Sequence, residues 1–231
     1  MVDNKAGVII NRQSRNYGID ALRIISMLMI VTLHVLKQGG ILDASESTNY
    51  WIAWFFEIAA FGAVDLYALI SGYVGVYSKY KFSNLAVLWC RVAFYSVSIT
   101  VICKFIIPDQ VDKKMMLYSL FPIFTDRYWY FTAYALLFLF IPILNEGLNR
   151  LSKQRLTAIL LAVVAATSAF QPIAKLLFDK GDVFVLKGGY TTWWLMIVYL
   201  IGGYIRKYGL FQKKKNIERL CSQSCISLLC R

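Results

Sequence analysis

The sequence Asp20-Ala-Leu-Arg-Ile-Ile-Ser-Met-Leu-Met-Ile-Val-Thr-Leu-His34 opens the first long apolar segment of the chain. It places an acid, a guanidinium group and the protein's single histidine in a helix whose other residues are suited to lipid. The eleven-residue step from Arg23 to His34 equals three helical turns plus about 20°, and about 16 Å along the helix axis. We therefore predict that both side chains project from the same face of one helix.

Ionisable side chains inside a membrane helix are costly, and they usually face a bundle interior or a wet cavity, where they have a function. Asp20, Arg23 and His34 are therefore candidate site residues. A purely structural alternative remains open for the same stretch. Arg23 could extend to the cytoplasmic headgroups with Asp20 as its i,i+3 partner, and His34 could lie at the opposite interface.

The composition of the chain is that of an integral membrane protein. Its 231 residues are 58% hydrophobic and 16% charged, with a mean hydropathy of +0.55, which is far more apolar than an average soluble domain. A helix needs about 20 apolar residues to cross a bilayer. We predict an all-α, polytopic membrane helix bundle with about six transmembrane helices, at residues 19–36, 51–76, 86–107, 128–144, 156–174 and 191–205. We expect Pro172 to break the end of the fifth span.

The distribution of basic residues predicts the orientation of these spans. The first span is longer than a signal-peptide core and is not followed by a small-residue cleavage site, so we interpret it as an uncleaved signal anchor. Alternate loops are basic, which predicts that both termini are cytoplasmic. The basic positions are Lys5, Arg12, Arg15, Lys79, Lys81, Arg150, Lys153, Arg155, Arg206, Lys207, Lys213, Lys214, Lys215 and Arg219. The predicted parts are a cytoplasmic arm at 1–18, a membrane domain at 19–206 and a basic, cysteine-containing cytoplasmic tail at 207–231.

The net charge of +12 is thus mainly a signature of topology. A nucleic-acid-binding protein would need a basic patch on a folded soluble face, and we expect no nucleic-acid partner. The compact run Lys213-Lys214-Lys215 lies beside the membrane, where it suits anionic membrane lipid.

The five cysteines predict no metal site. Cys221, Cys225 and Cys230 in the tail match no paired C-x-x-C zinc pattern, and on the reducing side of the membrane they should remain free thiols. Cys90 and Cys103 lie within the third span, where we expect buried thiols that behave as small apolar residues.

The end of the second span holds a further group of candidate residues. Ser71, Gly72 and Gly75 are small enough to let helices approach closely, which explains them without any catalytic role. Asp65 lies deep in the span, where a carboxylate needs a cationic partner such as Arg91 or Arg23, or a proton.

Cations near this point predict a binding site for phosphate. Lys79 and Lys81 follow the second span and Arg91 lies inside the third. With Arg23 they would form a positive vestibule suited to a phosphate-bearing donor from the cytosol. The alternative is that the lysines only mark the cytoplasmic side of the membrane.

Aromatic residues open the fourth span on the predicted outer side. Trp129 and Tyr130, with Tyr134 one turn later, could hold a sugar ring against their faces. An interfacial aromatic belt is the commoner reason for such a cluster.

Taken together, these motifs resemble those of the acyltransferase-3 family, bacterial multi-span membrane proteins that O-acylate, most often O-acetylate, cell-surface polysaccharides. The resemblance runs from about residue 17 to 145, and more loosely to 208. Its motifs are Arg23-x10-His34 preceded by Asp20, then Leu-Ile-Ser71-Gly72-Tyr73, then Tyr128-Trp129-Tyr130 with Tyr134, Pro142 and Asn145.

The resemblance implies an enzyme in the bacterial cytoplasmic membrane that takes an acyl group from acetyl-CoA or another acyl-CoA and delivers it to a hydroxyl of a surface glycan. It implies that His34 is the catalytic base and that Arg23 helps to bind the donor. We expect no bound cofactor, since acyl-CoA is a substrate. An imidazole suits this role because it can accept the proton of an attacking hydroxyl near neutral pH, or can itself be acylated.

The chain departs from the family pattern in two respects. Many members carry paired arginines after the second span, where this chain has Lys79-Tyr-Lys81 and the more distant Arg91. The family usually has about ten spans and this chain has about six, so an inactive truncated fragment is one alternative. A small-solute transporter or channel lined by Arg23, Asp65 and His34 is the other, although no inverted repeat supports it.

Overall fold

The computed structural model describes residues 16–122, 128–179, 181–182 and 184–209, and every regular element in these ranges is helical. The chain divides into two units, Met1–Leu66 and Tyr67–Arg231. Helix α4, Ala63–Gly75, begins in the first unit and ends in the second. The predicted arm and tail lie largely outside the described residues, as do Lys213, Lys214, Lys215, Cys221, Cys225 and Cys230.

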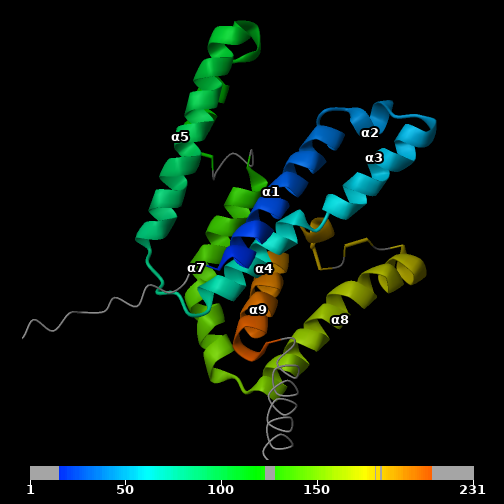
Figure 1. Cartoon of the computed structure of the whole chain (residues 1–231), viewed down its shortest axis with the longest axis vertical. Helices are drawn as coiled ribbons and strands as arrows, with labels where there is room; N and C mark the ends of the chain where they lie inside the picture. Colours follow the sequence, from blue (N-terminus) through cyan, green and yellow to red (C-terminus); the bar gives the residue numbers. More distant parts are fainter. Residues whose placement is uncertain (1–15, 123–127, 180, 183, 210–231) are drawn as a thin grey trace, which may run out of the picture. The chain divides into compact units, whose positions relative to one another are not determined.

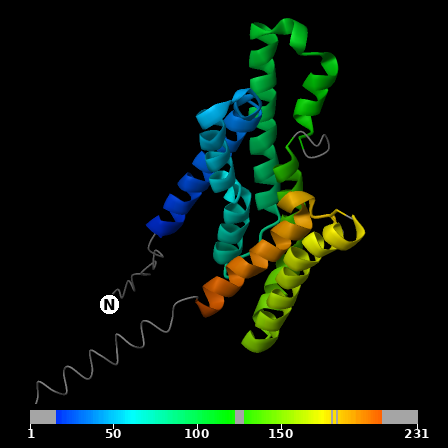
Figure 2. The same ribbon diagram turned by 90° about the vertical axis from the view of Figure 1, so that its right-hand side faces the viewer.

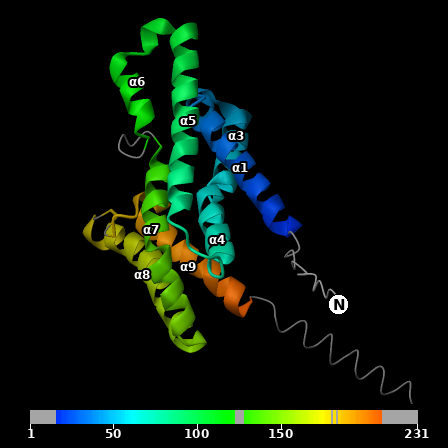
Figure 3. The same cartoon turned by 90° about the vertical axis from the view of Figure 1, so that its left-hand side faces the viewer.

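The first unit is built on two long helices that lie side by side, α1 at Tyr17–Lys37 and α3 at Ser47–Ala60 (Figures 1 and 3). Asn16 caps the start of α1, because its side-chain oxygen accepts the backbone N–H groups of Gly18 at 3.1 Å and Ile19 at 3.4 Å. The chain leaves α1 through Gly40, whose φ of 72° favours glycine, and enters the short helix α2 at Ile41–Ala44.

Polar side chains along α1 are satisfied within the helix. The hydroxyl of Ser26 donates to the carbonyl of Leu22 at 2.7 Å, and that of Thr32 donates to the carbonyl of Leu28 at 3.0 Å. These bonds remove the cost of placing a hydroxyl in an apolar environment. The helix can therefore carry them through a membrane without a partner on another helix.

The second unit contains the remaining long helices. They are α5 at Ser83–Ile106, α7 at Trp129–Arg150, α8 at Lys153–Phe178 and α9 at Thr192–Tyr208. Between α5 and α7 lie η1 at Pro108–Gln110 and α6 at Lys113–Leu120, which turns back along α5 (Figure 3). The short η2 at Lys187–Gly189 precedes α9, and α8 and α9 lie side by side (Figure 2).

The core of the second unit is the contact of α4 and α7 with α9. Leu137 and Leu148 of α7 and Leu195 and Tyr199 of α9 are fully buried. Gly72 of α4 lies so close to α9 that a Cβ atom placed there would overlap the backbone of Tyr199. Small residues at the crossing are what permits this approach.

Hydrogen bonds gather the ends of several helices on one side of the second unit. The Lys207 Nζ donates to the carbonyls of Leu148 at 2.5 Å and Asn149 at 3.3 Å, and Tyr204 and Thr157 share a hydroxyl contact of 2.8 Å. We call this region, residues 73–81, 145–157 and 203–208, the basic end. It brings together the segments after the second, fourth and sixth predicted spans, as the predicted topology requires, while the cytoplasmic orientation itself stays a prediction.

The predicted class, a polytopic helical membrane protein, is confirmed. Five described segments are long and apolar enough to cross a bilayer: Tyr17–Lys37, Ser47–Gly75, Ser83–Ile106, Trp129–Arg150 and Lys153–Phe178. The sixth predicted span corresponds to α9, which has 17 residues and is shorter than these. The chain is thus a multi-pass membrane protein.

One detail of the prediction was wrong and another is refined by the structure. The second predicted span is present as Ser47–Gly75, within which a turn at Phe61 and Gly62 separates α3 from α4. Pro172 does not end the fifth helix, since α8 continues through it to Phe178. A proline removes one backbone hydrogen bond, which a long helix can tolerate. Instead α8 ends where Asp179 adopts a left-handed conformation and its N–H bonds to the carbonyls of Ala174 and Lys175.

Candidate active site

The N-terminal part of α1 holds the predicted acid and guanidinium pair. The Arg23 Nη1 donates to Asp20 Oδ1 at 3.4 Å, and the two side chains are 46% and 26% exposed. The residues are three positions apart, so they lie on neighbouring turns of one helix face. Asp20 therefore orients Arg23, as the structural alternative for this stretch also anticipated.

His34 lies near the other end of the same unbroken helix, and its side chain is exposed. Its Nδ1 is 2.8 Å from the carbonyl oxygen of Ile30, one turn earlier. The eleven-residue step from Arg23 is therefore entirely helical, and the two side chains share a face of α1 at a separation of about 16 Å along the axis.

In the second unit, the predicted residues Ser71, Gly72 and Tyr73 each contact another helix. The Ser71 hydroxyl lies 3.4 Å from the hydroxyl of Tyr134 on α7. Gly72 packs against the backbone of α9. The Tyr73 hydroxyl accepts a hydrogen bond of 3.1 Å from Arg206 Nη1, and the guanidinium carbon lies 4.9 Å from the centre of the Tyr73 ring. This part of the sequence therefore joins α4 to α7 and α9.

A hydrogen-bonded group one turn further along α4 strengthens that junction. The Tyr199 hydroxyl donates to Asn145 Oδ1 at 3.0 Å, and Asn145 Nδ2 donates to the carbonyl of Gly75 at 3.0 Å. One amide side chain thus links three helices. The family resemblance pointed to Asn145, whereas no feature of the sequence pointed to Tyr199.

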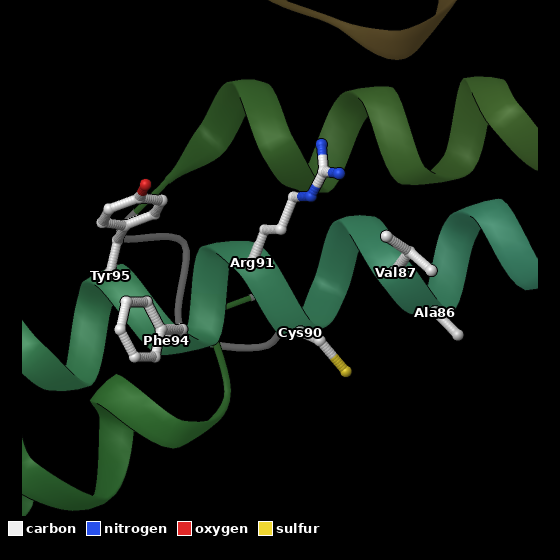
Figure 4. Close-up of a pocket in the computed structure, with 6 residues that line it drawn as sticks. All are labelled: Ala86, Val87, Cys90, Arg91, Phe94 and Tyr95. Atoms are coloured by element: carbon white, nitrogen blue, oxygen red, sulfur yellow. The ribbon is translucent and has the colours of Figure 1, made fainter.

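The predicted cations of the vestibule are all exposed. Lys79 and Lys81 lie in the connection from α4 to α5, and Arg91 lies about two turns into α5. Arg91 lines a shallow pocket of about 770 Å³ along the surface of α5 (Figure 4). The other lining residues are Ala86, Val87, Cys90, Phe94 and Tyr95. Cys90 is exposed on this helix surface and Cys103 is half-buried, so the expectation that both thiols of the third span are buried was wrong.

The predicted aromatic cluster at the start of α7 is present and gains a member from a distant loop. The Trp129 ring packs edge to face against Tyr190, with centroids 4.8 Å apart, and also against Tyr130 at 5.7 Å. Tyr130 stacks on Tyr134 at 5.9 Å. Tyr190 follows η2 and could not be assigned to this cluster from the sequence, since it lies 61 positions after Trp129.

Asp182 organises the loop that carries Tyr190. Its carboxylate accepts the backbone N–H groups of Leu186 and Lys187, both at 2.6 Å, and the side-chain amide of Gln171 at 2.7 Å. The hydrogen bond from Lys187, supported by those from Leu186 and Gln171, holds the pKa of Asp182 below its ordinary value of 3.8.

The structure thus presents two groups of candidate residues. Asp20, Arg23 and His34 lie in the first unit, whereas Ser71, Gly72, Tyr73, Lys79, Lys81, Arg91, Trp129 and Tyr130 lie in the second. No group of three or more histidine, cysteine or acidic side chains that could hold a metal ion occurs among the described residues. The two groups of candidate residues supply an imidazole, a carboxylate, guanidinium and ammonium groups, and hydroxyls.

Comparison with known proteins assigns the family. The sequence model of the acyltransferase-3 family, an acyltransferase domain, matches residues 16–226. Neither the curated proteins nor the solved structures contain a match to the chain. The family match includes all the described residues, from the cap of α1 to the end of α9. The chain therefore belongs to the acyltransferase-3 family of membrane acyltransferases.

Proposed function

We propose that this membrane acyltransferase moves an acyl group, in the first instance acetyl, from cytoplasmic acyl-CoA to a hydroxyl of a cell-surface or exported polysaccharide. In this proposal it acts in the bacterial cytoplasmic membrane and His34 is the general base. The family membership, the membrane helices and the exposed imidazole support the proposal.

The observation that carries the proposal is the contact between His34 Nδ1 and the carbonyl oxygen of Ile30 at 2.8 Å. A carbonyl oxygen can only accept a hydrogen bond, so Nδ1 must carry the proton. In the neutral imidazole the lone pair is then on Nε2. The contact with the helix backbone thereby leaves Nε2 as the ring nitrogen that can accept a proton.

The reaction follows from that tautomer. Nε2 accepts the proton of the acceptor hydroxyl while its oxygen attacks the carbonyl carbon of the thioester. The carbon–sulfur bond breaks, the new ester forms, and the imidazolium returns its proton to the departing thiolate. The products are the O-acyl glycan and coenzyme A, and the histidine ends in its starting form.

The other candidate residues have supporting roles in this proposal. Asp20 orients Arg23, which binds the donor, and Ser71, Gly72 and Tyr73 are further donor-binding residues of the proposal. Lys79, Lys81 and Arg91 attract the donor phosphates, since each is exposed. Trp129 and Tyr130 offer aromatic surface to the sugar ring of the acceptor.

Transfer of label from radioactive acetyl-CoA to an added polysaccharide, measured in membrane vesicles, tests the proposal. The His34→Gln variant should transfer about 10²- to 10⁴-fold more slowly, since glutamine cannot act as a base. Lys37→Gln is the matched control, because Lys37 is exposed on the last turn of the same helix. Equal rates for His34→Gln and Lys37→Gln would overturn the role of His34.

A further inference from the structure

Arg206 lies at the C-terminal end of α9, where the sequence marked it only as a topology signal. Its guanidinium is held in two ways by the same tyrosine. One N–H group donates to the Tyr73 hydroxyl at 3.1 Å, and the guanidinium carbon lies 4.9 Å from the centre of the Tyr73 ring. A cation held against an aromatic ring is restricted in orientation, which lowers the entropy lost when its remaining N–H groups bind a ligand.

The charge around Arg206 is not balanced by acids. The basic end contains one carboxylate among its described residues, Glu146, and this group pairs with Arg150. No carboxylate bonds to Arg206 in the part of the chain that the structure describes, and its side chain is exposed. A guanidinium group that is held in one orientation, and to which no described carboxylate bonds, is suited to bind an anion with two acceptor oxygens.

Two neighbouring lysines, Lys153 and Lys207, already make other contacts. Lys207 donates to the carbonyls of Leu148 and Asn149 at the end of α7. The Nζ atoms of Lys153 and Lys207 lie 5.6 Å and 5.3 Å from the centre of the Tyr208 ring. These lysines bond to free carbonyl groups at a helix end and pack on an aromatic ring. They therefore stabilise the structure as well as contributing to the positive electrostatic potential.

We propose that Arg206, positioned by Tyr73, binds a phosphate group, and that this phosphate belongs to the coenzyme A portion of the donor. The assignment rests on the proposed function, because Tyr73 is a candidate donor residue and Arg206 lies directly against it. The exposed Lys79 and Lys81 follow Tyr73 in the chain and add positive field at the same end. An anionic lipid headgroup offers the same phosphate chemistry and is the alternative source.

The test measures binding and needs no catalysis. The full chain, in nanodiscs of neutral phosphatidylcholine, is titrated with acetyl-CoA and with acetyl-pantetheine, a thioester without phosphate. Arg206→Gln should weaken acetyl-CoA binding roughly 10- to 100-fold, the usual effect of one charge-assisted contact, and should leave acetyl-pantetheine binding unchanged. Arg206→Lys should recover only part of the loss, because a lysine lacks the planar pair of donors.

Two further variants distinguish a specific contact between Arg206 and phosphate from the general effect of removing one positive charge at the basic end. Arg150→Gln removes the same charge at the same end from an arginine that already has Glu146 as its partner, so it should change acetyl-CoA affinity less than about twofold. Tyr73→Phe keeps the ring and removes the hydroxyl, and should give a loss smaller than that of Arg206→Gln. Each variant is first checked for native helix content and a monodisperse elution profile.

Three results would overturn the proposal: equal losses for Arg206→Gln and Arg150→Gln, an equal loss for acetyl-pantetheine, or no binding of acetyl-CoA by the unmodified chain. A parallel experiment uses nanodiscs that contain phosphatidylglycerol and measures the phosphatidylglycerol that stays bound to the purified protein. If Arg206→Gln loses this lipid but keeps its affinity for acetyl-CoA, the phosphate belongs to lipid. That result would also overturn the proposal. Failure of the His34 test leaves this binding result intact, so the two proposals fail separately.

Discussion

Tyr199 of α9 donates its hydroxyl hydrogen to Asn145 of α7 at 3.0 Å, and Asn145 in turn donates to the backbone of α4. The pair lies one turn from the Ser71-Gly72-Tyr73 segment, so it holds the helix that carries three of the candidate donor residues. Its contribution to stability can be measured directly.

Asn145→Ala should destabilise the protein by about 1–2 kcal/mol, because it removes two interhelical hydrogen bonds and leaves the Tyr199 hydroxyl and the Gly75 carbonyl without their partner. The measurement is the thermal unfolding of the purified chain in detergent. Asn149→Ala, an exposed asparagine one turn further along α7, is the control and should have little effect. If Asn145→Ala destabilised the protein no more than Asn149→Ala does, the hydrogen bonds of Asn145 would not contribute to stability.

Gly72→Ala should reduce the yield of folded protein sharply. A Cβ atom at this position would overlap the Tyr199 backbone, and neither helix can move without disturbing the buried residues around it. Gly147→Ala is the matched control, because nothing lies within 4 Å of its added Cβ and alanine favours a helix by about 1 kcal/mol. Fluorescence-detected size exclusion of the tagged variants compares the two. A normal yield for Gly72→Ala would refute the close contact of α4 with α9.

The loop held by Asp182 should open on acidification. Its carboxylate has a folded-state pKa below the ordinary value, so the hydrogen bonds contribute fully above pH 3.8 and are lost as the pH falls through the lowered pKa. Hydrogen exchange at Leu186 and Lys187, normalised to an unstructured peptide, should accelerate over that range. At neutral pH the Asp182→Asn variant should already show faster exchange at these two amides, since a neutral amide oxygen is a weaker acceptor. Unchanged protection in Asp182→Asn would remove Asp182 from this role.

The helices were predictable because a bilayer imposes a simple rule on sequence. A run of about 20 apolar residues must form a helix to satisfy its backbone, and the spans at 86–107 and 128–144 follow that rule closely. Hydropathy is averaged over a window, so it could not reveal the turn at Phe61 and Gly62 or the continuation of α8 past Pro172. Both depend on local backbone geometry.

The site was predictable where it is local in sequence. Asp20, Arg23 and His34 share one helix, so helical periodicity alone relates them. The contact of Tyr73 with Arg206 spans 133 positions, and that of Trp129 with Tyr190 spans 61. Such contacts arise from how helices and loops pack, for which the single sequence carries no periodic signal. A clue existed in the paired Gly202 and Gly203, whose small size permits close packing of α9 on α4 and α7.

The central claim is that His34 catalyses acyl transfer to a surface glycan. Its most direct test is the O-acetyl content of the host's surface polysaccharide, measured by proton NMR in cells that carry the unmodified chain, the His34→Gln variant or neither. Immunoblots of the membrane fraction establish that both proteins are present. We predict O-acetyl signals with the unmodified chain and background levels in the other two strains. Equal O-acetyl content with the unmodified chain and with His34→Gln, above the level of the strain that lacks both, would contradict the role of His34, and background levels in all three would contradict the transfer itself.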